Sequence, residues 1–416
     1  MADKVVLAYS GGLDTSVAIR WLREERGYDV IALTVDVGQE RDIPQVQKRA
    51  EATGAIKAVV RDGRELFVRY FVFPALAAGA LYQGQYPLAT ALARPLIAKL
   101  MVDVAREEGA AAVGHGSTGK GNDQVRFDVS VQALAPDLEI VAPVREWDMK
   151  TREDEIAYAA RHNIPVPVTK ESPYSTDENL WGRSIECGVL EDPWQEPPED
   201  IFVWTRSVAK APDKPRYVEI AFERGIPVAL DGQEMDGVTL IERLHEWAGE
   251  HGVGRIDHLE DRLVGIKSRE IYEAPAAVTL LRAHEALEQM TLSKAQRSLK
   301  ARLAGEYADL IYNGLWFTAH HQDLASYVQS TQRHVTGTVR MRLHKGQAAP
   351  VGRRSSKSLY DVALATYDQG DQYDQSAAVG FIKIWGLPVQ VQARAQLLAE
   401  PGEPLRIATP QSEGEE

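Results

Sequence analysis

The sequence has 416 residues, 44% hydrophobic and 26% charged, and these fractions favour neither a membrane protein nor a disordered chain. At about 150 residues per domain, this length predicts two or three domains. The net charge of −13 argues against a nucleic-acid partner, and a single cysteine excludes an internal disulfide or a CxxC redox pair. Because no basic and apolar export signal opens the sequence, we expect a cytoplasmic protein without a membrane partner.

Apolar runs alternate with helix-like stretches in the first third of the chain. Strands are predicted at Lys4–Tyr9, Tyr28–Gly38, Ala55–Asp62 and Ala110–Gly116, and helices at Thr15–Arg26, Gln45–Gly54 and Ala89–Gly109. Repeated strand and helix units of this kind predict an α/β fold, with a parallel sheet covered by helices on both faces. Ligands in such folds bind at the carboxyl ends of the strands.

The pattern changes after a helix that begins at Thr151, with Asp154 in capping-box spacing. A segment rich in proline and serine follows, and we place a domain boundary there. A second, α+β domain is expected from a hairpin at 217–232, helices at Thr239–Gly252 and within Pro275–Gly314, and strands at His334–Gly346 and Ser358–Tyr367. The predicted division is 1–170, 171–375 and 376–416, the last part being amphipathic with a disordered acidic tail.

The first strand ends at the string SGGLDTS, residues 10–16. Its two glycines allow a tight turn, its hydroxyl groups add hydrogen-bond donors, and the helix that follows contributes partial positive charge at its N-terminus. These features predict a polyphosphate site. The loop lacks the lysine and spacing of a Walker A motif and is not a GxGxxG turn.

A second loop, Gly114–Asp128, contains four glycines and then Lys120, Asn122, Asp123 and Arg126. Its backbone can approach an anion closely, while Asn122 and Arg126 suit carboxylates and Asp123 suits an amine. Three further clusters contain Tyr86 with Thr90, Ser175 with Ser184, and Glu260 with Tyr272. Each of these three, taken alone, is explained as well by a structural role.

SGGLDTS resembles the PP-loop of the N-type ATP pyrophosphatases, which cleave ATP between its α and β phosphates. Across nearly the whole chain, AYSGGLDTS, YPLATALARPLIAK, HGSTGKGNDQVRFD, YSTDENLWGRSIECGVLEDP and GVGRIDHLEDRLVGIKSREIYEAPAA resemble the argininosuccinate synthase family in order and spacing. The resemblance implies an AMP-forming ligase of arginine biosynthesis that uses ATP with Mg²⁺, citrulline and aspartate. It also implies a homotetramer, with residues 1–170 binding ATP, 171–375 completing the synthetase and 376–416 joining subunits.

The same resemblance assigns the site residue by residue. ATP binding is implied for Ala8, Tyr9, Ser10, Gly11, Gly12, Leu13, Asp14, Thr15, Ser16, Val35 and Gly116. Aspartate binding is implied for Thr118, Asn122 and Asp123, and citrulline binding for Tyr86, Thr90, Asn122, Arg126, Ser175, Ser184, Glu260 and Tyr272. Charge complementarity suits Glu260 to the citrulline amine and Arg126 to its carboxylate. No general base is evident, and Asp14 and Asp123 are the candidates.

The chain departs from the family pattern at three positions. Ala91 follows Thr90 where some members have a second hydroxyl, Ser117 stands where others have a small apolar residue, and Val35 is bulkier than the expected alanine. Two alternative functions stay open at this point. One is another PP-loop AMP-forming ligase, although a thiolase or glutaminase would need cysteine chemistry and a tRNA enzyme a more basic surface. The other is a non-catalytic adenine-nucleotide binding protein.

Overall fold

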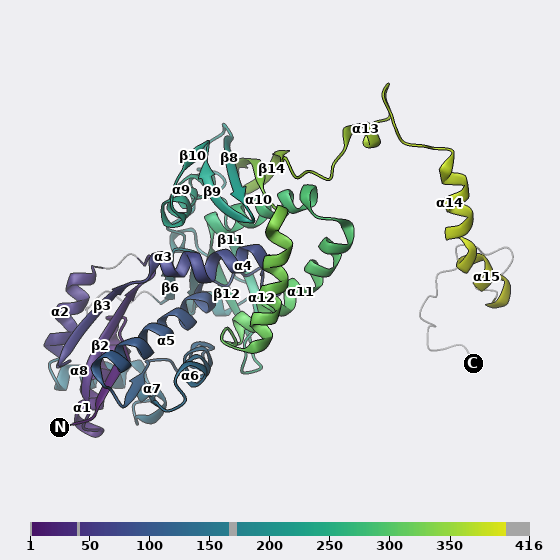
Figure 1. The fold of residues 1–416 in the computed structure, drawn as a ribbon. Helices are drawn as coiled ribbons and strands as arrows, with labels where there is room; N and C mark the ends of the chain where they lie inside the picture. Colours follow the sequence, from purple (N-terminus) through teal and green to yellow (C-terminus); the bar gives the residue numbers. More distant parts are fainter. Residues whose placement is uncertain (1, 40–41, 166–172, 397–416) are drawn as a thin grey trace, which may run out of the picture. The chain divides into compact units, whose positions relative to one another are not determined.

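The computed structural model of the chain describes residues 2–39, 42–165 and 173–396 (Figure 1). The chain divides into two compact units, Met1–Leu359 and Tyr360–Glu416. The boundary predicted near 170 falls on residues 166–172, outside the described residues. The division at 170 and 375 therefore stays a prediction.

The first sheet of the larger unit is parallel, as the alternating pattern predicts. Within the described residues its strand order is β3-β2-β1-β4-β5. The bounds are β1 Lys4–Ala8, β2 Asp29–Asp36, β3 Lys57–Asp62, β4 Ala112–Gly114 and β5 Glu139–Val141. Because the order reverses at β1, the loops after β1 and β4 leave the sheet side by side and open a crevice at its carboxyl edge.

Helices cover both faces of this sheet because its strands carry apolar residues on alternate sides. Val5 and Leu7 of β1 pack with one group of helices, whereas Val6 packs with the other. The first group is α1 Leu13–Glu25, α2 Ile43–Thr53 and α8 Arg152–Arg161, and the second includes α5 Ala89–Glu108 and α6 Asp123–Leu134. The capping box predicted for Thr151 and Asp154 is confirmed at the start of α8.

Two antiparallel sheets follow in the same unit. One has the order β11-β12-β7-β6, with β6 Ser175–Asn179, β7 Gly182–Glu186, β11 Arg255–Asp261 and β12 Lys267–Glu273. The other has the order β10-β9-β8-β13-β14, with β8 Arg216–Glu223, β9 Ile226–Leu230, β10 Gln233–Glu234, β13 Gly337–His344 and β14 Gln347–Arg354. The hairpin predicted at 217–232 is confirmed as β8 and β9. The first of these two sheets contributes to the site.

The remaining long helices pack around these sheets and build one apolar core with the α5 face of the first sheet. They are α9 Gly237–Glu250, α10 Pro275–Thr291, α11 Lys294–Tyr312 and α12 Ala319–Thr331. Shorter pieces are α3 Arg64–Phe67, a π turn at Val68–Val72, α4 Phe73–Ala78, α7 Pro143–Glu146 and 3₁₀ turns at Gly188–Glu191, Glu199–Ile201 and Gln332–His334. The helical region predicted within Pro275–Gly314 is thus confirmed as α10 and α11.

A seam of hydrogen bonds joins the hairpin β6–β7 to the first sheet. Leu180 N donates to Val37 O at 2.9 Å, and the Asn179 amide donates to Ala89 O at 2.8 Å. The Trp181 indole N–H donates to Pro87 O at 2.9 Å, and its side chain is fully buried. These contacts fix the hairpin, which carries Ser175, Asp177 and Ser184, against α5.

The strand predicted at Ser358–Tyr367 is wrong. Helix α13 Val362–Ala365 lies there, and the Asp361 carboxylate accepts the Ala363 N–H at its start, which is a typical helix cap. The second strand of that region is instead β14, which pairs with β13. It contains Pro350, which is tolerated because β14 lies at the edge of its sheet.

The smaller unit, from Tyr360 onward, contains α13, α14 Ala377–Trp385 and α15 Leu387–Gln396. Phe381, Ile384 and Trp385 of α14 are each more than half exposed. The acidic tail predicted at the end of the chain lies outside the described residues. Among the described residues, the structure contains no helix with the length and apolar character needed to cross a bilayer.

Candidate active site

The SGGLDTS loop joins β1 to α1 at the carboxyl edge of the first sheet. Gly11 has φ +77°, and a Cβ there would lie 3.1 Å from both methyl groups of Val46, so the turn favours glycine. The Arg49 guanidinium of α2 donates to Gly11 O at 2.6 Å and holds the turn from behind. Gly12 is the cap residue of α1 and provides no side-chain cap. The first N–H groups of α1 therefore suit an external anion.

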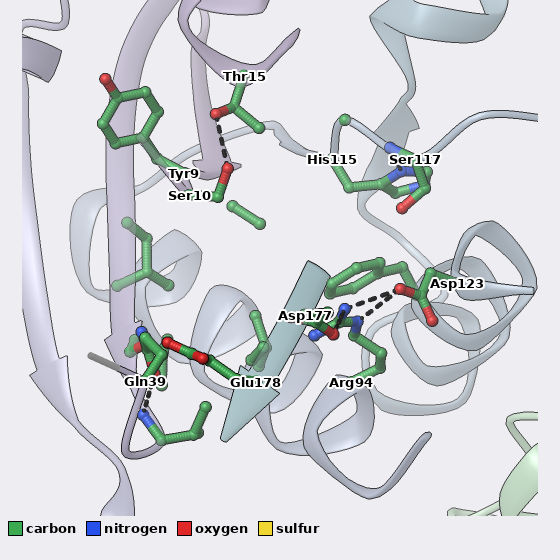
Figure 2. A pocket seen from close by; sticks show the side chains of 17 residues that line it. Tyr9, Ser10, Thr15, Gln39, Arg94, His115, Ser117, Asp123, Asp177 and Glu178 are labelled. Carbon is green, nitrogen blue, oxygen red and sulfur yellow. Dashed lines mark hydrogen bonds and ion pairs between the residues drawn. The ribbon is translucent and has the colours of Figure 1, made fainter. Parts of the chain in front are cut away.

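A narrow slot of about 200 Å³ runs from this loop along the ends of β1 and β2 (Figure 2). Tyr9, Leu33, Val35 and Val37 provide its apolar lining, and Gly116 closes it on the β4 side. A Cβ on Gly116 would come within 2.9 Å of the Thr15 methyl group, so the two glycine loops approach too closely for a larger residue. The slot has the shape and lining of a site for a flat ring joined to an anion.

His115 orders the second loop. Its Nδ1 accepts the Ser117 N–H at 3.2 Å, so its Nε2 carries the proton that is shared with Asp128 at 2.7 Å. The ring is almost completely buried and stacks on Phe127. This arrangement directs the backbone of residues 116–118 toward the slot.

Arg94 of α5 joins two carboxylates at the junction of the slot and a larger cavity. Its guanidinium pairs with Asp123 at 2.8 Å and with Asp177 of β6. Asp123 in turn accepts from the buried Arg126 at 2.8 Å. Although burial alone would raise the pKa of Asp123, Arg94 and Arg126 lower it below its usual value. Asp123 is therefore a carboxylate at neutral pH.

Glu260, on β11, lines the larger cavity and is only 2% exposed. Tyr272 donates to its Oε2 at 2.6 Å and Tyr312 donates to its Oε1 at 2.5 Å. Burial, followed by the Glu260 charge, raises the pKa of the Tyr312 hydroxyl, which stays a donor. Asn122 bridges to this group because its amide nitrogen donates to Tyr312 at 2.8 Å.

Stacked tyrosine rings form the apolar wall beside Glu260. Tyr86 stacks on Tyr272 with 4.1 Å between ring centroids, and Tyr82 stacks on Tyr312 at 3.6 Å. The Tyr86 hydroxyl accepts the Thr90 N–H at 3.0 Å. Tyr86 is only 3% exposed, because Tyr272 covers its ring.

A second carboxylate cluster lines the same cavity. Arg262 pairs with Glu186 of β7 and with Glu270 of β12, the latter at 2.9 Å. Burial, then the neighbouring charges of Glu186 and Glu260, raise the pKa of Glu270 to about 8. Glu270 thus holds a proton at pH 7 in the folded protein, whereas an unfolded chain has released it.

This raised pKa predicts a pH effect on stability. Because the folded state keeps the proton of Glu270 that the unfolded state loses, the free energy of unfolding falls as pH rises from about 4.5 to about 8. Glutamine has no such proton to lose. The melting temperature of the parent protein should therefore fall between pH 6 and pH 8.5. In Glu270→Gln we expect this fall to be smaller by about 2–4 °C.

The matched control is Glu199→Gln, at an exposed carboxylate that Arg255 pairs with and whose pKa is lowered. It should follow the parent curve over this pH range in a differential scanning calorimetry series. Parallel curves for Glu270→Gln and the parent protein would contradict the assignment of the proton to Glu270.

The structure brings nearly all the predicted residues to two adjoining cavities. The larger, of about 510 Å³, is lined by Ser10, Gly12, Leu13, Asp14, Tyr86, Thr90, Gly116, Thr118, Asn122, Asp123, Arg126, Ser175, Ser184, Glu260 and Tyr272. Ala8, Tyr9, Thr15 and Val35 line the slot, and Gly11 lines a third cavity behind the loop. Ser16 lies beneath the loop, fully buried and hydrogen-bonded to the Tyr9 hydroxyl at 3.0 Å.

Several charged or polar residues of this site were not predicted from the sequence. Arg94 lies one helical turn after Thr90, and this spacing could have placed it on the same face of α5. Asp177 lies between the predicted Ser175 and Ser184 on the same hairpin. Nothing in the sequence signals Tyr312, which reaches the site from the end of α11.

Comparison with known proteins identifies both halves of the chain. Residues 4–165 match the family model "Arginosuccinate synthase N-terminal HUP domain", and residues 174–392 match "Arginosuccinate synthase C-terminal domain". The argininosuccinate synthase of Dehalococcoides mccartyi is 58% identical over 400 residues, which cover 96% of this chain and 98% of the relative. The argininosuccinate synthase of Oceanobacillus iheyensis is 56% identical over 94% of both chains. That of Symbiobacterium thermophilum is 57% identical over 94% of this chain and 98% of the relative. The chain belongs to the argininosuccinate synthase family.

Proposed function

We propose that the two adjoining cavities bind the three substrates of an argininosuccinate synthase, with the roles given below for their lining residues. The enzyme is an ATP-dependent ligase that joins citrulline and aspartate and releases AMP and diphosphate. One observation carries the assignment of the site: the slot and the larger cavity share Ser10, Arg94, Gly116, Ser117, Asp123 and Asp177. A nucleotide in the slot would therefore present its α-phosphate to whatever fills the cavity.

The slot suits ATP. Its apolar end takes the base, and the loop Ser10–Ser16 with the N-terminus of α1 takes the phosphates. Ser10 and Thr15 share a hydrogen bond at 3.1 Å, so their hydroxyls face the same side of the loop. Loop and helix would stabilise the diphosphate as it leaves, since both present hydrogen-bond donors to the developing charge.

The chain fits Mg²⁺ only as a partner of the ATP phosphates. Among the described residues no group of three or more potential ligands forms a metal site, whereas Mg²⁺ commonly uses one or two carboxylates together with substrate phosphates. Asp14, at the start of α1, is the carboxylate placed to assist. Mg²⁺ bound there would neutralise phosphate charge.

The larger cavity suits citrulline. Glu260 accepts two tyrosine hydrogen bonds, and a carboxylate has about four acceptor sites, so it can still bind the α-amine. Arg126 uses Nε on Tyr312 O and Nη1 on Asp123, which leaves Nη2 to face the α-carboxylate. Tyr86, Thr90, Ser175 and Ser184 provide further polar groups along the cavity.

Two steps follow from this placement. The ureido oxygen of citrulline attacks the α-phosphorus of ATP, which breaks the bond to diphosphate and gives a citrullyl adenylate. The aspartate amine then attacks the ureido carbon, and AMP leaves with the oxygen. Thr118, Asn122 and Asp123 are the proposed aspartate ligands, and positioning supplies most of the rate.

Of the two candidate bases, Asp123 is held as a carboxylate by two arginines, which also makes it a weak base. Asp14 faces Glu155 of α8, and burial followed by the Asp14 charge raises the pKa of Glu155 to about 8. Glu155 thus keeps its proton at neutral pH, next to Asp14 of the phosphate loop. We favour Asp14 as the group that exchanges a proton with substrate.

Assembly and location are part of the proposal. Helix α14 exposes Phe381, Ile382, Ile384 and Trp385, which suits it to a subunit contact, and we expect a homotetramer in the cytoplasm. Analytical ultracentrifugation tests the assembly: Phe381→Ser with Trp385→Ser should dissociate it.

The function is tested with ATP and Mg²⁺ alone, with either amino acid, and with both. Argininosuccinate, AMP and diphosphate should form in equal amounts when both are present. With citrulline carrying ¹⁸O in its ureido group, the label should appear in the phosphate of AMP. Release of ADP and phosphate, or AMP formation that ignores both amino acids, would contradict the proposal.

A further inference from the structure

The Gln39 carboxamide lies at the apolar end of the slot and makes two hydrogen bonds with the end of strand β2 (Figure 2). Its Nε2 donates to Val35 O at 2.7 Å. Its Oε1 accepts the Val37 N–H at 2.8 Å. One planar group thus satisfies a carbonyl and an N–H two residues apart.

Both backbone groups face the side of β2 that β1 has left. Tyr9 N donates to Leu33 O at 2.8 Å, which is the last such bond between β1 and β2. In a strand, residues two apart direct their backbone groups to the same side, so Val35 O and Val37 N continue the row that begins at Leu33. The Gln39 side chain therefore fills the place of a neighbouring strand.

An adenine ring offers the same pair of hydrogen-bonding groups. Its 6-amino group is a donor and its adjacent N1 is an acceptor, in the order in which a carboxamide presents N–H and oxygen. Under the proposed function, on which this inference rests, the base lies in the apolar end of the slot. Val35 O and Val37 N are the backbone groups there that can read its edge.

We propose that Gln39 is a built-in competitor of adenine, which ATP must displace from the end of β2. The Val37 N–H has one proton and can serve one acceptor at a time, either Gln39 Oε1 or adenine N1. Gln39 thereby lowers the affinity for ATP and makes the site reject ligands that cannot replace both of its hydrogen bonds.

If Gln39 competes with adenine, its removal strengthens ATP binding, whereas a purely structural role for Gln39 predicts that its removal weakens ATP binding. Gly38 has φ +92°, and its N–H donates to the Asp36 carboxylate at 2.8 Å, so the turn after β2 has support besides Gln39. Leu180 N also holds Val37 O. If Gln39 nevertheless ordered the turn or contacted the base itself, its removal would weaken ATP binding.

The test measures ATP binding by calorimetry on the full chain, without citrulline or aspartate, for the parent protein, Gln39→Ala and Gln39→Asn. The asparagine side chain is one methylene shorter, so its carboxamide does not reach Val35 O and Val37 N together. We expect the Kd for ATP to fall by about threefold to tenfold in both variants, the factor that corresponds to one or two net hydrogen bonds. Purine riboside triphosphate, which lacks the 6-amino group, should gain by a similar factor.

Two controls separate this effect from a general change. Inorganic tripolyphosphate, which contacts only the loop, should bind all proteins equally. Gln47→Ala removes a comparable bond, from Gln47 Nε2 to Ala58 O at 3.1 Å, and should leave the Kd for ATP unchanged. Weaker ATP binding in both Gln39 variants, or equally tighter tripolyphosphate binding, overturns the inference. If the parent protein formed no AMP in response to citrulline and aspartate, that result would instead overturn the proposed function.

Discussion

Replacing Arg94 with methionine is expected to lower kcat by about 100-fold or more and to destabilise the fold by about 3–5 kcal/mol. Arg94 is the cation shared by Asp123 and Asp177, and its side chain is only 15% exposed. Methionine fills a similar volume but leaves two half-buried carboxylates without this partner. The Asp123 side chain would then change position, and so would Arg126, which pairs with it.

Arg106→Met is the matched control, since Arg106 lies on the same helix α5 and pairs with Asp137 in solvent. An exposed ion pair of this kind contributes about 0–1 kcal/mol to the free energy of unfolding. Because Arg106 also lies outside both cavities, kcat should stay within about twofold of the parent value. Urea unfolding and steady-state rates would measure both effects. An Arg94→Met protein that keeps parent kcat would show that the Asp123 and Asp177 pairs do not position substrate.

The second large effect is expected at Glu260. Glu260→Gln should raise the KM for citrulline by about 30-fold or more, because it removes the buried charge proposed to bind the α-amine. The glutamine amide would also face a tyrosine hydroxyl that now donates to a carboxylate oxygen. The KM for aspartate should change by less than about threefold, since Thr118, Asn122 and Asp123 keep their partners.

Asp257→Asn serves as its control because the exposed Asp257 lies on the same strand β11 and pairs with Arg269, and neither residue lines the cavity. Its KM for both amino acids should equal that of the parent protein. Initial rates measured at saturating ATP, with one amino acid varied at a time, distinguish the two effects. Equal increases in both KM values for Glu260→Gln would mean that Glu260 organises the whole cavity rather than one subsite.

The parallel sheet and its two glycine loops could be predicted because their signals are local. A β-branched run followed by SGG predicts a strand, a turn and a helix from neighbouring residues alone. The positive φ of Gly11 likewise belongs to the turn itself and does not depend on distant parts of the chain. By the same reasoning, the capping box at Thr151 was found from two residues three positions apart. Where local signals conflict, prediction fails: Ser358–Tyr367 has strand-like residues, but the Asp361 cap begins a helix.

The interior of the site could not be predicted in this way. Glu260 is buried because Tyr272 and Tyr312 surround it. Tyr312 lies on a helix 52 residues later in the chain. Arg94 gains its importance from Asp177, which is 83 residues away. Such pairs depend on how the sheets pack. The family resemblance pointed to Glu260 and Tyr272, but to neither Arg94 nor Asp177.

The seam that joins hairpin β6–β7 to the first sheet also bears on how such a protein can be recombined. Leu180 N, the Asn179 amide and the Trp181 indole donate to the carbonyls of Val37, Ala89 and Pro87, so the N-terminal family region contributes only main-chain acceptors to this seam. Hybrids built from two relatives with a crossover between 165 and 174 should therefore assemble the seam even where sequences have diverged. Their incompatibilities should concentrate at side-chain pairs such as Arg94 with Asp177, which a hybrid inherits from different parents.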